Sequence, residues 1–116
     1  MRTSELTGAA LDWAVAKCIG GHIGVADECV CFDLNDGEGF NIFKPSTDWA
    51  QGGPIIEREE IDILMEQRDL KTWAAEIYRS PKGYIPQRGT TPLVAAMRCY
   101  VANKLGDEVE IPKELT

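Results

Sequence analysis

The chain has 116 residues, of which 44% are hydrophobic and 27% charged, a composition typical of one globular domain that spans residues 1–116. The net charge of −7 argues against general affinity for nucleic-acid backbones, which attract clustered cations. No apolar run reaches the roughly 18 residues that cross a bilayer, and the first residues lack the apolar core of a signal peptide. We therefore expect a cytoplasmic protein with no nucleic-acid or membrane partner.

The first predicted element is a helix within residues 7–21. Thr7 is the expected N-cap, with Ser4 as the alternative, and Gly20 and Gly21 stop the helix. Helical spacing relates the apolar residues Leu11, Ala14, Val15 and Cys18. This periodicity predicts one face of the helix in a core.

Residues 27–43 are predicted to form a β-hairpin. Its first strand alternates thiols with apolar side chains, in the order Cys29, Val30, Cys31 and Phe32. The two pairs therefore lie on opposite faces of the strand. The turn falls at residues 35–37, where Asn-Asp-Gly tolerates positive φ, and residues 40–43 return as the partner strand.

The region after residue 54 is ambiguous. A long helix from Pro54 to Arg68 is one interpretation. We favour a second hairpin, because apolar residues alternate in 61–65 and again in 73–77, with 68–71 as the connection. Residues 79–90 contain two prolines and two glycines and are predicted to be a loop.

The last predicted helix carries the strongest signals. Thr91 is its N-cap, Pro92 its first helical residue, and Gly106 follows its end. With a short helix between the two hairpins, the elements predict an α+β fold. In this fold a small antiparallel sheet of two hairpins packs against an N-terminal and a C-terminal helix.

Four residues could supply ligands for zinc, in the spacing C-x3-H-x6-C-x-C: Cys18, His22, Cys29 and Cys31. The usual structural knuckle is C-x2-C, however, and a C-x-C strand can place both thiols in a core instead. We expect no metal and no cofactor, with a zinc-bound interaction module as an alternative. The DLNDGEG stretch at 33–39 is a turn rather than a calcium loop, because its glycine falls one position early.

Candidate catalytic residues are few. The chain has one histidine, His22, and the double glycine between it and Cys18 makes a Cys–His pair doubtful. The charge run at 57–60 is typical of a solvated face. We therefore predict no catalytic residues. A small enzyme acting on a nucleotide or peptide, through Asp48, Glu57 or the Cys18–His22 pair, is the alternative.

Two segments are predicted to form the walls of one ligand site. The first is PSTDWAQGGPIIERE, residues 45–59, where capping residues precede Trp49 and a double glycine would let another group approach the backbone. In a purely structural interpretation, Gly52 ends one turn and Pro54 begins the next helix. The second segment, 79–91, is the most basic part of the chain and leads into a helix N-terminus, which favours an anion.

The candidate ligand-binding residues are Asp48, Trp49, Gln51, Gly52, Gly53, Arg79, Arg88, Thr90 and Thr91. Lys82 adds a cation, and Tyr84 adds a second stacking face to that of Trp49. We expect the two segments to lie side by side, with Trp49 at the rim and Arg88 or Arg79 facing inward. Such a site suits a phosphate-bearing or nucleotide-like ligand.

Three blocks of the chain resemble the NinX-like family of tailed-phage and prophage proteins. They read TSELTGAALDWAVAKC, PSTDWAQGGPIIERE and TPLVAAMRCYVANKLGDEVEIP, stand in the family's order and are long enough to be specific. The resemblance implies an accessory protein that acts in the cytoplasm of the bacterial host, and it brings no established activity. We expect a non-enzymatic binder of a host protein or of a small anionic, nucleotide-like ligand. The sequence leaves a homodimer open.

Overall fold

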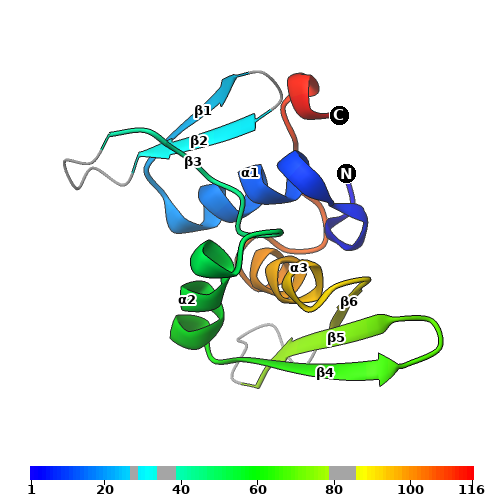
Figure 1. The fold of residues 1–116 in the computed structure, drawn as a ribbon. Helices are drawn as coiled ribbons and strands as arrows, with labels where there is room; N and C mark the ends of the chain where they lie inside the picture. The colour runs from blue at the N-terminus through cyan, green and yellow to red at the C-terminus, as the bar shows by residue number, and fades with distance from the viewer. Residues whose placement is uncertain (27–28, 34–38, 79–85) are drawn as a thin grey trace.

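A computed structural model describes residues 1–26, 29–33, 39–78 and 86–116 (Figure 1). The described helices are α1 (Gly8–Ile19), α2 (Trp49–Glu59) and α3 (Pro92–Leu105), with short 3-10 turns η1 (Thr3–Glu5) and η2 (Lys113–Leu115). One antiparallel sheet joins β1 (His22–Ala26), β2 (Cys29–Asp33) and β3 (Asn41–Ile42). A second joins β4 (Ile61–Gln67), β5 (Thr72–Ile77) and β6 (Gln87–Gly89). Among the described helices, none has the length and apolar character needed to cross a membrane.

The predicted α+β class and the two terminal helices are confirmed. Figure 1 shows α1 and α3 between the two sheets, with α2 at their side. The two predicted hairpins therefore belong to separate sheets, and each sheet contains a third strand that was not predicted. The main core lies where α1 meets α3, and its large buried side chains include Leu6, Leu11, Val15, Met97 and Val101. A smaller cluster of Ala16, Val30 and Phe32 joins the first sheet to α1.

Helix α1 begins and ends where the sequence predicted. Thr7 is its N-cap residue, although its side chain makes no capping hydrogen bond, and Gly20 closes the helix at a φ of 81°. A positive φ is accessible to glycine without a steric penalty. Leu11, Ala14 and Val15 are buried, as their spacing predicted.

The first hairpin is confirmed, and its register pairs Cys31 with Ile42. Strand β1 was not predicted, and it pairs with β2 along its whole length. Val30 and Phe32 face the core, whereas Cys29 is exposed. The interpretation that both thiols of the C-x-C pair lie in a core is therefore wrong, because the apolar pair occupies that face. The predicted turn at 35–37 lies outside the described residues.

Helix α2 runs without interruption from Trp49 through Pro54 to Glu59, so the break after Gly52 in the purely structural interpretation does not occur. The long helix to residue 68 is also excluded, since Glu60 adopts a left-handed conformation (φ 53°) that ends α2. Strand β4 follows at once and pairs with β5, with Ile61 opposite Ile77. The favoured second hairpin is thus confirmed.

Helix α3 matches its prediction closely. The Thr91 hydroxyl accepts the Val94 N–H at 3.1 Å, and Gly106 ends the helix at a φ of 93°. The loop predicted for 79–90 is corrected in part, because residues 87–89 form strand β6, which pairs Arg88 with Ala74 of β5. Residues 79–85 lie outside the described residues.

The chain's first residues pair with the segment that follows α3. The Met1 ammonium group donates to the Val109 carbonyl at 3.0 Å. The Thr3 N–H donates to the Asp107 carbonyl at 2.7 Å, and its hydroxyl donates to the Gly106 carbonyl at 2.7 Å. Thr3 is buried, so these bonds satisfy polar groups that water cannot reach.

Candidate functional site

Most polar groups at the start of α2 are engaged within the protein. Asp48 is the N-cap, and its Oδ1 accepts the Ala50 N–H at 2.9 Å. The Gln51 amide donates to the Ile42 carbonyl at 2.9 Å and accepts the Lys44 N–H at 2.6 Å. By donating and accepting in this way, Gln51 pairs with the edge of β3 much as a neighbouring strand would.

The two adjacent glycines of α2 have different surroundings. A Cβ atom added to Gly52 would lie 2.5 Å from the Pro45 carbonyl oxygen and 2.6 Å from Leu93 Cδ2. One added to Gly53 would meet nothing within 4 Å. The close backbone approach predicted for this segment therefore occurs at Gly52, but it brings α2 against the protein's own chain.

A buried carboxylate fixes the turn that precedes α2. Asp12 of α1 accepts the Ser46 N–H at 2.9 Å. Burial raises the pKa of Asp12, while the hydrogen bond from the Ser46 N–H and the charge of Lys44 act in the opposite direction. The bond holds residues 45–48 on α1 and so sets the position at which α2 begins.

The two predicted walls do lie side by side. A small cavity of about 240 Å³ is lined by Ser46 and Trp49 on one side and by Thr91 and Val94 on the other. Trp49 is 55% exposed. Arg88 does not line this cavity, so the expectation that it faces inward here is wrong. Arg79, Lys82 and Tyr84 lie outside the described residues.

Arg88 and Thr90 instead line a separate cavity of about 440 Å³. Its walls come from η1, the start of β5, β6 and α3. The side chains with polar ends that line it are Ser4, Thr72, Gln87, Arg88, Thr90 and Arg98. We call this the Arg98 cavity. Arg88 is held at one side by an ion pair with Glu66 of β4, with 2.7 Å between Nε and Oε1.

Arg98 is the residue that sequence reasoning missed. Its Nε donates to the Leu6 carbonyl at 2.8 Å and its Nη1 donates to the Arg88 carbonyl at 2.7 Å. Within the described part of the chain it forms no ion pair. Burial lowers the pKa of Arg98. Arg98 is thus a partly buried cation that is oriented by backbone carbonyls and has no carboxylate partner in the part of the chain that the structure describes.

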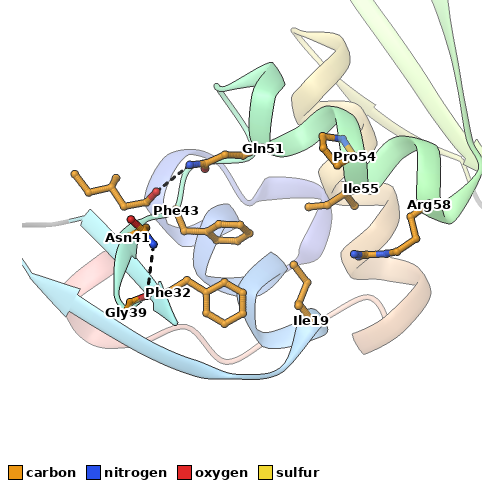
Figure 2. Close-up of a pocket in the computed structure, with 10 residues that line it drawn as sticks. Ile19, Phe32, Gly39, Asn41, Phe43, Gln51, Pro54, Ile55 and Arg58 are labelled. Carbon is orange, nitrogen blue, oxygen red and sulfur yellow. Dashed lines mark hydrogen bonds between the residues drawn. The ribbon is translucent and has the colours of Figure 1, made fainter. Parts of the chain in front are cut away.

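A third cavity, of about 280 Å³, lies between the first sheet and α2. Figure 2 shows Ile19, Phe32, Phe43 and Ile55 pointing into it from four different segments, with Arg58 at one side. The rings of Phe32 and Phe43 are tilted by 57° with their centroids 4.9 Å apart. We call this the apolar cavity. Because its walls are distant in the sequence, no local pattern could have predicted it.

The cation of the apolar cavity, unlike Arg98, has a carboxylate partner. Arg58 Nε donates to Glu59 at 3.0 Å, and its Nη2 donates to the Tyr100 hydroxyl at 3.5 Å. The bond to Glu59 raises the pKa of Arg58. Lys104 lies 3.7 Å from the same carboxylate. Arg58 and Lys104 also line a neighbouring cavity of about 410 Å³, so Arg58 stands between an apolar and a polar space.

The residues proposed for catalysis are not brought together. Asp48 is engaged as a helix cap. Burial raises the pKa of the Cys18 thiol to about 12, so it stays protonated at neutral pH and is a poor nucleophile. Among the described residues, no hydrogen bond joins any two of Asp48, Glu57, Cys18 and His22.

The four proposed zinc ligands are likewise separated. The described residues contain no group of three His, Cys, Asp or Glu side chains that could hold a metal ion. Cys29 and Cys31 share the outer face of β2, whereas Cys18 is partly buried on α1. The four-ligand zinc arrangement is therefore not formed in this fold.

The fold and its cavities define a small α+β protein with several candidate binding surfaces. The family model described as bacteriophage P22, NinX matches residues 2–104. The chain belongs to this phage family, which confirms the resemblance seen in the three sequence blocks. No curated protein was found to match the sequence.

Proposed function

We propose that this phage protein is a non-enzymatic binder of a small phosphate-bearing ligand of the host cytoplasm, nucleotide-type in character, and that the ligand occupies the Arg98 cavity. The observation that carries the proposal is the Arg98 guanidinium, which lines the cavity and pairs with no carboxylate of the described residues. Burying part of a cation without a counter-charge is unfavourable. An anionic ligand would supply the missing charge.

The backbone bonds of Arg98 support a role in recognition. A guanidinium has five N–H donors in a rigid plane, and two of its nitrogens are oriented by the Leu6 and Arg88 carbonyls. The donors that these carbonyls leave over are consequently fixed before any ligand arrives. Planar, preoriented donors suit phosphate oxygens, which accept two parallel bonds from arginine.

The neighbouring groups support the same class of ligand. Arg88 supplies a second cation, and the hydroxyls of Ser4, Thr72 and Thr90 line the same cavity. Hydroxyl groups can donate to further phosphate oxygens. Glu66 already pairs with Arg88, so a ligand at Arg88 would have to share or displace that carboxylate, whereas no described carboxylate competes for Arg98.

Thermal unfolding in increasing concentrations of inorganic phosphate, nucleoside monophosphates and cyclic nucleotides tests the proposal. Binding to the folded state raises stability by about 1.4 kcal/mol when the ligand reaches ten times its Kd. We expect the rise with a nucleotide, and its loss in Arg98→Gln. Arg68→Gln is the matched control, because Arg68 is an exposed residue in the β4–β5 connection.

Arg88→Gln provides a second variant in case Arg98→Gln folds poorly, since the Arg88 side chain is exposed. We expect it to weaken nucleotide binding about tenfold, the typical effect of losing one charge-assisted hydrogen bond. Nucleotide binding that is equal in the wild type, Arg98→Gln and Arg88→Gln would refute the assignment. Hydrolysis of the nucleotide on long incubation would instead favour the alternative that the protein is a small enzyme.

A further inference from the structure

The apolar cavity shares no lining residue with the Arg98 cavity. We infer that it is a second binding site, which takes an aromatic or branched-aliphatic group that carries a carboxylate. The inference does not depend on the proposed function. It rests on the shape and lining of this cavity and on the placement of Arg58.

The cavity's size and walls set the apolar part of the ligand. A space of about 280 Å³ is just below the range of about 300–1,000 Å³ that is usual for drug-sized ligands, so it suits one ring or one branched chain. Its walls include Ile19 of α1, Phe32 of β2 and Ile55 of α2. A ring that enters would meet the tilted Phe32–Phe43 pair, and aromatic groups pack favourably in such tilted arrangements.

The polar part of the ligand follows from Arg58. Figure 2 shows its guanidinium turned toward Ile19 across the cavity. The bond from Nε to Glu59 occupies one edge of the guanidinium, and Nη2 reaches Tyr100 at the long distance of 3.5 Å. A guanidinium can pair with a carboxylate through another edge. The Arg58 side chain is 53% exposed, so the new pair can form without displacing Glu59.

Exposed apolar side chains lie at the cavity and beside it. Phe40 and Ile42 are 56% and 57% exposed, and Ile42 also lines the cavity. Contiguous exposed apolar side chains often mark a binding site on a protein surface. The two amides that line the cavity, those of Gln51 and Asn41, bond to backbone groups, and Arg58 is the charged lining group that selects an anion over a neutral ligand.

A pair of ligands that differ only in charge tests the inference. N-acetyl-phenylalanine carries the apolar group and the carboxylate, whereas N-acetyl-phenylalaninamide lacks the charge. Binding is measured by NMR titration of the full chain at neutral pH. We expect the acid to bind about tenfold more tightly than the amide, the effect of one charge-assisted bond.

Two variants separate the contributions. Arg58→Gln should lower the affinity for the acid to that for the amide and leave amide binding unchanged. Ile42→Ser should weaken both ligands by the same factor, because it removes apolar contact alone. Arg68→Gln, far from the cavity on the β4–β5 connection, is the matched control and should change neither affinity.

A third ligand, a tetrapeptide that ends in phenylalanine, shows whether the carboxylate belongs to a peptide C-terminus or to a free organic acid. Tighter binding than N-acetyl-phenylalanine would indicate the C-terminus of a peptide, and equal binding a free organic acid. Either result supports the site. Equal affinities for acid and amide in the wild-type chain, or no saturable binding of either, would overturn it. Inorganic phosphate should not compete, so failure here is distinguishable from failure at the Arg98 cavity.

Discussion

The start of α2 and the corner between β6 and α3 are both rich in polar groups, but they use those groups differently. At the start of α2, Asp48 caps the helix and Gln51 pairs with β3. At the β6–α3 corner, Arg98 bonds to two backbone carbonyls, pairs with none of the described carboxylates and faces a cavity. Glycines and helix caps can therefore serve packing alone. A candidate binding site is marked instead by hydrogen-bond donors that the protein does not fully engage.

The contacts of the α2 segment also explain the three sequence blocks of the family resemblance. Ser46 of the second block bonds to Asp12 of the first. Gly52 lies against Leu93 of the third, and Arg98 of the third bonds to the Leu6 carbonyl of the first. The three blocks thus contact each other pairwise, and a structural reason for their joint occurrence exists beside any functional one.

The largest expected effect is the difference in the free energy of unfolding between alanine variants of the two glycines of α2. Gly52→Ala should lower the free energy of unfolding by about 1–3 kcal/mol, the usual cost of overpacking a buried position, because the new methyl group would press on the Pro45 carbonyl and Leu93. Gly53→Ala is the matched control and should raise it by about 0.5–1 kcal/mol through helix propensity. Urea unfolding measures both. Equal changes in the free energy of unfolding would show that Gly52 is no more tightly packed than Gly53.

Removing the Gln51 amide should have the next largest effect. Gln51→Ala deletes the hydrogen bonds to Ile42 of β3 and to Lys44 just after it, and it should lower the free energy of unfolding by about 1–3 kcal/mol, given about 0.5–1.5 kcal/mol for each bond. Gln67→Ala, an exposed residue at the end of β4, is the control and should change it little. An unchanged midpoint for Gln51→Ala would mean that the amide is not needed to hold β3.

Asp12 gives a smaller effect that depends on pH. Burial raises its pKa in the folded state, so the native protein retains this proton at pH values where the unfolded chain, with a pKa of about 4, has lost it. The contribution of Asp12 to stability is therefore greatest below about pH 4 and falls as pH rises through the folded-state pKa. Asp12→Asn keeps an acceptor for Ser46 and removes this dependence.

The stability of Asp12→Asn relative to the wild type should consequently increase between pH 4 and pH 7, as measured by urea unfolding across that range. Parallel stability curves for the two proteins would show that the Asp12 pKa is not shifted.

The smallest expected effect is at Trp49. Its side chain is 55% exposed and lines only the small cavity beside α3. Trp49→Ala should change the free energy of unfolding by no more than about 0.5 kcal/mol, as is usual for surface positions. Thermal unfolding measures it. A loss above about 2 kcal/mol would assign Trp49 to the packing of α2 and remove it from the candidate binding residues.

Much of the fold was predictable because its signals are local. Thr91, Pro92 and Gly106 mark the ends of α3 within the sequence itself, and the alternation in 61–65 distinguishes β4 from a helix. Strand β6 has only three residues, Gln87–Gly89, without an apolar alternation, so no local pattern indicates it. The passage of α2 through Gly52 and Pro54 depends on packing against Leu93, which is a contact between distant segments.

The candidate sites were predictable only in part for the same reason. The site predicted from the sequence contains Trp49 and Thr91, which line one cavity. It also contains Arg88 and Thr90, which line another. The sequence could not identify Arg98, since what sets that residue apart is its partial burial and its bonds to the Leu6 and Arg88 carbonyls, and such contacts between separate segments have no signature in a single sequence.

The pairing of the first residues with the segment after α3 has a consequence for how the protein is made. Met1 meets its partner only when Val109 is available, 108 residues later. At synthesis rates of about 5–20 residues per second, the N-terminal segment waits roughly 5–20 s on the ribosome before its own backbone bonds can close. Until then Thr3, which is buried in the finished fold, remains in water, so this part of the core closes only after the segment that follows α3 has been made.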